Sequence, residues 1–174
     1  MKLDELKRAV AAGRLRFGFI RSVKHHISVW ISAAVAGYVL AGVSSMFVPG
    51  LELLIFPLPF IAAIAGSYYL NRQLRFVSAE TKLSPNAAFA VVERVIDHEA
   101  WAVNKRTKKL LICQTIDNCL VTIIIYSGRV HVASHCVPEA LFPWAQIVTN
   151  EINVNKVIGQ IKRAEHNPDF LAIK

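Results

Sequence analysis

The chain has 174 residues, 54% of them hydrophobic, and carries a formal net charge of +8. This length leaves room for a membrane segment and one small domain of about 100 residues. Three cysteines, an odd number, argue against a disulfide-stabilised secreted domain and favour reduced thiols.

The segment 1–26 is a basic arm, with seven basic and two acidic residues. Leu3, Leu6 and Val10 recur at helical spacing before Gly13, which predicts a short amphipathic helix. Two interpretations are open. The helix lies on the anionic inner leaflet of a membrane, or the basic residues serve only as a topology signal.

Residues 27–70 are predicted to form a two-helix transmembrane hairpin, with spans at 27–48 and 53–70. Each span is uncharged and close to the ~20 residues that a helix needs to cross a bilayer. Pro57 and Pro59 predict a kink or a loosened first turn in the second span. The alternative is a pair of buried helices in a soluble protein. The absence of ionisable residues from both spans argues against an ion-coupled carrier.

Charge next to the spans predicts their orientation. The basic arm precedes the first span, Arg72 and Arg75 follow the second, and the connecting turn carries only Glu52. Since Lys and Arg near span ends stay on the cytoplasmic side, both termini are expected in the cytoplasm.

Small residues recur every four positions in the first span, and the same spacing appears in the second. They either pack the two spans together or pack one protomer against another in an oligomer. The stripe consists of Ala33, Gly37, Ala41 and Ser45, with Ala62 and Gly66 on the second span.

A linker at 71–83 is expected to lead into a small α+β cytoplasmic domain at 84–174, built as helix, four-stranded antiparallel meander and helix. Ser84 and Pro85 form a helix start. Strands are expected at 100–104, 110–115, 120–126 and 129–135, with a basic turn at 104–108 and a tight turn at Ser127-Gly128. The last helix carries apolar residues at helical spacing at Val154, Val157, Ile158 and Ile161.

The strand at 120–126 is apolar on both faces, which is typical of a strand covered on both sides. Two helices cover one face, and we expect a second copy of the domain to cover the other. In the strand at 129–135, Val130 and Val132 point to one face, while Arg129, His131 and His135 point to the open one.

Catalytic motifs are missing from the sequence: there is no phosphate-binding loop, nucleophile elbow or zinc-protease motif. His131, His135, Cys113 and Cys136 lie on neighbouring strands, but their spacing matches no structural zinc pattern. A cysteine–histidine nucleophile from the same residues is an alternative of equally low weight. We therefore expect no enzyme activity, no metal and no cofactor.

Basic and aromatic side chains on the sheet predict a binding surface for an anionic ligand. Basic groups bind phosphate and aromatic faces stack on bases, and the surface is too small for duplex nucleic acid. The alternative for the lysines is a solvated turn near anionic lipid. The predicted ligand-binding residues are Trp101, Lys105, Arg106, Lys108, Lys109, Tyr126, Arg129 and His131.

The layout of a hairpin at 27–70 and a domain at 84–165 resembles the two-span membrane-anchored ancillary effectors of type III CRISPR systems. The resemblance covers the whole chain as architecture. It implies an antiviral homo-oligomer whose cytoplasmic domains bind a cyclic oligoadenylate, with cyclic tetra-adenylate favoured, and then disrupt the inner membrane. The alternative is a subunit of a bacterial secretion, conjugation or exclusion complex that uses its domain to dock proteins.

Overall fold

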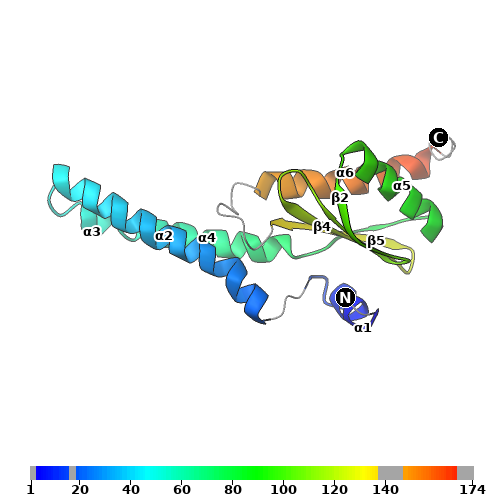
Figure 1. Ribbon diagram of the computed structural model, residues 1–174, viewed down its shortest axis with the longest axis horizontal. Coiled ribbons are helices and arrows are strands. Elements are labelled where there is room, and N and C mark those ends of the chain that lie inside the picture. Colours follow the sequence, from blue (N-terminus) through cyan, green and yellow to red (C-terminus); the bar gives the residue numbers. More distant parts are fainter. Residues whose placement is uncertain (1–2, 16–18, 137–146, 168–174) are drawn as a thin grey trace. The chain divides into compact units, whose positions relative to one another are not determined.

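The computed structural model describes residues 3–15, 19–136 and 147–167 (Figure 1). The chain forms two compact units. One contains residues 1–16, 73–136 and 146–174, and we call it the sheet unit. The other contains residues 17–72 and 137–145, and we call it the hairpin unit.

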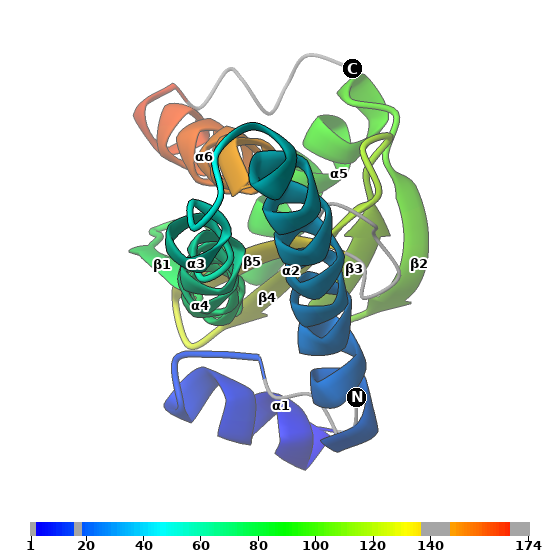
Figure 2. The ribbon, with the colours of Figure 1, turned by 90° about the vertical axis from the view of Figure 1, so that its left-hand side faces the viewer.

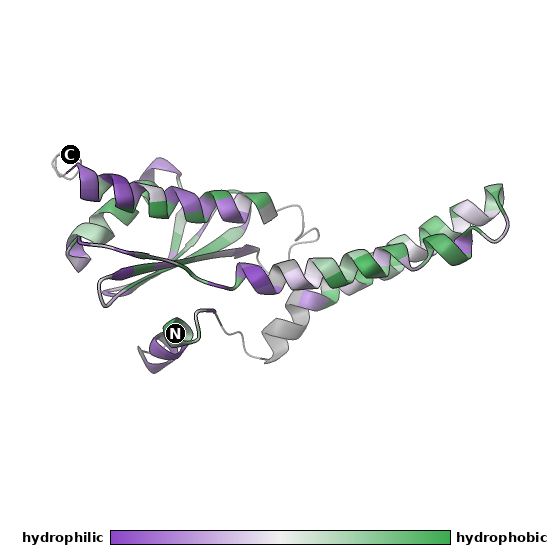
Figure 3. Cartoon of the chain, turned by 180° about the vertical axis from the view of Figure 1, so that it is seen from behind, coloured by the Kyte–Doolittle hydropathy of each residue, from purple (hydrophilic) through white to green (hydrophobic). Residues whose placement is uncertain are grey.

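The hairpin unit consists of α2 (Phe19–Phe47), α3 (Glu52–Ile55) and α4 (Leu58–Gln73). Two helical stretches, 29–47 and 52–73, are long and apolar enough to cross a membrane. Figure 3 shows predominantly apolar residues along both. The predicted pair of apolar helices is confirmed, although α2 begins eight residues before the expected span. The second stretch is interrupted between α3 and α4, at Phe56 and Pro57, as Pro57 led us to expect.

Close packing of α2 against the second stretch depends on glycines. A Cβ atom added to Gly37 would lie 3.3 Å from the Phe56 carbonyl oxygen and 3.4 Å from the Phe60 ring. On the return helix, a Cβ at Gly66 would lie 3.4 Å from Val29. The small residues thus pack the two helices of one chain together, the first of the two interpretations of the stripe.

The contact line differs from the predicted stripe in two places. Ser44 and Ala63 are buried, whereas Ser45 and Ala62 are exposed. A helix turns once every 3.6 residues, so a strict repeat of four drifts around the helix and leaves the contact line after two or three steps.

We predict that Gly37→Leu destabilises the hairpin by about 1–3 kcal/mol, because the new side chain overpacks the contact with Phe56 and Phe60. Gly42→Leu is the matched control, since no atom of the described chain lies within 4 Å of a Cβ at that position. Unfolding of the full chain in detergent measures both variants. Equal stabilities would contradict the packing described here.

The sheet unit contains a five-stranded antiparallel sheet in the order β1-β5-β4-β3-β2. The predicted α+β class is confirmed, but the predicted four-stranded meander lacked one strand of the sheet. The missed strand, β1, lies within the segment 71–83 assigned to a linker and pairs with β5. Its four residues are mostly exposed, and the alternation of Val77 and Ala79 with Ser78 and Glu80 is too short to indicate a strand by itself, so the pairing with β5 reveals it. The strands are β1 (Val77–Glu80), β2 (Ala102–Thr107), β3 (Leu110–Gln114), β4 (Cys119–Tyr126) and β5 (Arg129–Cys136).

Helices α5 (Pro85–His98) and α6 (Ile147–His166) cover one face of this sheet (Figure 2). The Ser84 hydroxyl caps α5 by accepting a hydrogen bond of 3.3 Å from the Ala87 N–H, as its sequence position predicted. Val130 and Val132 lie in the core beneath the helices, which confirms the predicted facing of β5.

The basic turn is shorter than expected. Strand β2 extends to Thr107, with a register irregularity between Val103 and Lys105, so only Lys108 and Lys109 form the turn. Lys105 and Arg106 therefore belong to a strand, where successive side chains point to opposite faces.

The second face of the sheet is covered within the same chain, which corrects our expectation that a second copy covers it. Leu110 and Ile124 are buried there, with Val10 of α1 (Leu3–Ala11) and Phe76 packed against them. Figure 2 shows α1 on the side of the sheet opposite α5 and α6. The amphipathic helix predicted for the arm is thus present, but Val10 packs on protein.

Backbone hydrogen bonds hold the arm beside the start of the domain. The Leu15 N–H donates to the Leu74 carbonyl at 2.7 Å, and the Phe76 N–H donates to the Gly13 carbonyl at 2.9 Å. We call these paired segments, 13–15 and 74–76, the backbone clasp.

Candidate ligand-binding pocket

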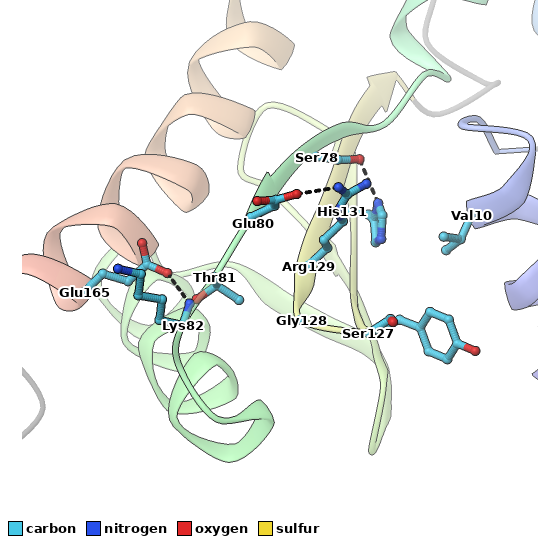
Figure 4. A pocket seen from close by; sticks show the side chains of 11 residues that line it. Val10, Ser78, Glu80, Thr81, Lys82, Ser127, Gly128, Arg129, His131 and Glu165 are labelled. Atoms are coloured by element: carbon cyan, nitrogen blue, oxygen red, sulfur yellow. Dashed lines mark hydrogen bonds and ion pairs between the residues drawn. The ribbon is translucent and has the colours of Figure 1, made fainter.

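A pocket of about 800 Å³ opens beside the β4–β5 turn and the β1 edge of the sheet (Figure 4). Its walls come from segments that are far apart in the sequence: the arm, β1 and its following loop, the β4–β5 hairpin and the end of α6. The lining residues are Val10, Ser78, Glu80, Thr81, Lys82, Tyr126, Ser127, Gly128, Arg129, His131 and Glu165.

Arg129 is the main cation of the pocket. Residues 80 and 129 are direct partners in the antiparallel β1–β5 pair, and their side chains form an ion pair. Both side chains are more than half exposed, 54% for Arg129 and 79% for Glu80. Exposed ion pairs of this kind contribute roughly 0–1 kcal/mol, so an incoming anion can displace Glu80 at little cost.

His131 lies two residues further along β5 and faces the same side. Its Nδ1 shares a hydrogen bond of 2.7 Å with the Ser78 hydroxyl, and its ring meets the Phe76 ring edge-on at 6.1 Å. The histidine is buried, which contradicts our expectation that this sheet face is open. Burial lowers the pKa of His131, and the neighbouring Arg129 charge lowers it further. The imidazole is therefore held in its neutral form near pH 7.

Tyr126 supplies an aromatic surface at the end of β4. The ammonium group of Lys109, in the β2–β3 turn, lies 5.2 Å from the centre of its ring, a cation–π contact. Ser127 and Gly128 connect β4 to β5, and both have positive φ, 53° and 70°. Such a two-residue turn fits the right-handed twist of the strands and fixes Tyr126 opposite Arg129.

The α6 side of the pocket is acidic. The Lys82 N–H donates a hydrogen bond of 2.8 Å to the Glu165 carboxylate. The pKa of Glu165 is lowered, chiefly by the Thr81 hydroxyl and also by this N–H, so the carboxylate is ionised near pH 7. The described lining thus contains two basic side chains, Lys82 and Arg129, and two acidic ones, Glu80 and Glu165.

Three of the eight residues predicted to bind ligand line the pocket: Tyr126, Arg129 and His131. Lys109 does not line the pocket, but it contacts the ring of Tyr126, which does. The contributions of the arm, β1, the following loop and α6 to the pocket were not predicted. The serine, threonine and charged residues of the segment 78–82 were the available signal in the sequence, and this segment was assigned to the linker.

The other predicted residues lie elsewhere. Trp101 is a core residue, only 7% exposed, so its ring packs on apolar side chains and is not available for stacking on a ligand. Arg106 forms an ion pair with Glu93 of α5 on the helix-covered side. Lys105 and Lys108 are exposed on β2 and its turn, at the opposite edge of the sheet from β1.

No metal site is found in the part of the chain that the structure describes. No group of three or more histidine, cysteine or acidic side chains there could hold a metal ion. Cys113 is buried, and burial raises its pKa to about 11, so the thiol is protonated and inert at neutral pH.

Comparison with protein-family models, with curated proteins and with solved structures finds no match to this chain.

We predict that the stability of the sheet unit falls with acidification because of His131. Its native pKa lies below the ~6.5 of an unfolded histidine, so the unfolded chain binds more protons as the pH falls below that value. The contribution of His131 is complete above about pH 6.5 and is lost toward its native pKa.

Thermal unfolding between pH 7.5 and pH 5 measures this effect. His131→Asn retains a hydrogen-bonding amide but cannot be protonated, so its melting temperature should fall less steeply on acidification than that of the wild type. His98→Asn, which changes an exposed histidine of α5, should retain the wild-type slope. If the melting temperature of His131→Asn fell with pH as steeply as that of the wild type, the pH dependence would not come from His131.

Proposed function

We propose that the protein is a membrane-anchored sensor whose sheet unit binds a small phosphorylated nucleotide. The apolar hairpin is the anchor, with both termini in the cytoplasm. The resemblance in layout favours a cyclic oligoadenylate as the ligand, with cyclic tetra-adenylate as the first candidate. It also suggests that the response to binding is disruption of the inner membrane. The observation that carries the proposal is the convergence of Tyr126, Arg129 and His131 in one pocket.

These three side chains supply complementary chemistry for a nucleotide. The Arg129 guanidinium offers paired donors suited to a phosphate group, and the Tyr126 ring offers a face on which a base can stack. Nδ1 of His131 shares a hydrogen bond with Ser78, so Nε2 is the ring nitrogen that can offer one to a ligand. A volume of about 800 Å³ lies within the usual range of small-molecule sites.

A ligand in this pocket touches both segments that lead into the hairpin. Val10 belongs to the arm before α2, and Ser78 belongs to β1, which follows α4. The backbone clasp ties these two segments together at positions that, along the sequence, lie between the pocket residues and the hairpin. Because a ligand shifts an equilibrium only by its difference in affinity for two states, ligand binding would act on the hairpin by favouring one arrangement of the arm and β1.

We predict that Arg129→Ala weakens the binding of cyclic tetra-adenylate about 10- to 100-fold, the loss expected for a hydrogen-bonded phosphate contact. Calorimetry on the full chain in lipid nanodiscs measures the dissociation constant. Lys108→Ala is the control, because it removes the same charge from the turn at the opposite sheet edge. A larger loss for Lys108→Ala than for Arg129→Ala would place the ligand on the basic turn and refute the pocket.

A second function, protein docking within a membrane complex, is supported by the exposure of β2. This edge strand is exposed along its whole length, and an extended segment of another protein could pair with it. A folded full-length chain that binds none of the cyclic di-, tri-, tetra- or hexanucleotides would favour this function over nucleotide sensing.

A further inference from the structure

The two edge strands of the sheet, β1 and β2, run in the same direction. Each of the four neighbouring pairs in the order β1-β5-β4-β3-β2 is antiparallel, so the first and last strands are parallel to each other. Figure 2 shows them at opposite edges of the sheet. One copy of the sheet can therefore continue into the next by parallel pairing of β1 with β2.

The two edges carry complementary side chains on matching faces. Val77 and Val103 are each 49% exposed. Their register partners on the neighbouring strands, Val132 and Cys113, belong to the core, so both valines lie on the sheet face that α5 and α6 cover. These valines are apolar groups at the rim of the core. Joining the two edges would remove both from water.

Glu80 and Lys105 lie on the other face, that of α1. Glu80 is the register partner of Arg129, and Lys105 is the register partner of Ile112, which packs with Leu110 and Ile124. Lys105 takes this face because the register shifts between Val103 and Lys105. A register that sets Val77 beside Val103 places Ser78 beside Lys105, because the irregularity makes Lys105 the next paired position of β2. Glu80 then lies two positions from Lys105 on the same face, a diagonal that long side chains can span.

We propose that the β1 edge is an interaction surface for the β2 edge of a second copy of this chain. The two sheets join in parallel, with the valines meeting on the helix-covered face and Glu80 meeting Lys105 of the neighbouring copy on the other. The contact is heterologous, because each copy uses a different edge, and it repeats from one copy to the next.

Self-pairing of a single edge is disfavoured by charge. An antiparallel pair of two β2 edges places Lys105 and Arg106 close to the same cations of the partner, and like charges across a strand pair are destabilising. Unlike charges meet only when β1 faces β2.

Parallel pairing also keeps the connection to the hairpin at the same end of the strands in every copy. Only residues 74–76 separate α4 from β1, so the start of β1 lies within about 14 Å of the end of α4 along an extended chain.

This contact also changes the pocket, and this part of the inference rests on the proposed function. Glu80 lines the pocket, and the pocket's own described side chains balance two cations against two anions. Lys105 of the neighbouring copy would neutralise Glu80 and leave Arg129 free for a phosphate. Lys105, predicted to bind ligand yet placed at the far edge, would thus contribute to the pocket of the next copy.

Disulfide cross-linking in membranes tests the contact without any nucleotide. Two full-length chains with tags of different size are co-expressed, one with Val77→Cys and the other with Val103→Cys. Neighbouring strands bring paired Cα atoms within disulfide range. Mild oxidation should give the mixed dimer, whereas either variant expressed alone should give none. The wild type controls for the three native cysteines, and Lys162→Cys paired with Val103→Cys controls for random collisions.

Charge exchange provides the second readout. Glu80→Lys on the Val77→Cys chain should reduce the mixed dimer several-fold, and so should Lys105→Glu on the Val103→Cys chain. The two changes together should restore it. Dimers from either single-cysteine variant alone, or a mixed dimer no more abundant than the collision control, would overturn the proposal. Since no nucleotide is present, cross-linking without measurable nucleotide affinity would refute the proposed ligand and leave this contact standing.

Discussion

Strand β4 has apolar side chains on both faces, and the hydrophobic effect requires that both be removed from water. Val121, Ile123 and Ile125 meet the core formed with α5 and α6, whereas Ile124 is buried on the other face with Val10 and Phe76. The second cover comes from the arm, from residues that precede the hairpin in the sequence. The sheet unit is therefore assembled from segments that come before and after the hairpin in the sequence.

The position of the pocket follows from this arrangement. Where α1 meets the β1 edge, the apolar cover gives way to polar side chains, and Ser78, Arg129 and His131 line the pocket together with Val10 and the β4–β5 turn. The pocket marks the boundary between a face buried by α1 and an edge open to other molecules. The same edge carries Glu80, so ligand binding and contact between copies would use one region of the molecule.

Periodic apolar patterns predicted most of the helices and strands, because amphipathic packing alone determines them. Helix α5 and the strands β3, β4 and β5 were located closely from their sequence patterns, with β2 displaced by two or three residues. Helix α6 was recognised from its apolar spacing at Val154–Ile161, but it begins at Ile147, seven residues before Val154. Strand β1 and the cover from α1 could not be predicted in this way, because both depend on contacts between distant segments. The pocket was found only in part for the same reason: Arg129 and His131 were recognised from strand alternation, but Ser78 and Glu80 come from β1. Trp101 was wrongly predicted to bind ligand, because an aromatic residue beside a basic turn has the same sequence pattern whether its ring faces solvent or the core.

The backbone clasp has a consequence for how the protein is made. Leu15 and Leu74 are hydrogen-bonded to each other, so the sequence of the hairpin is inserted within that of the sheet unit. During synthesis the arm emerges before Leu110 and Ile124, so Val10 can pack on them only after the hairpin and the first four strands have followed. Removing everything before β1 would strip Val10 from Leu110 and Ile124 and expose them. Replacing the hairpin with a short loop that joins residue 15 to residue 74 would instead remove both apolar helices and keep this contact.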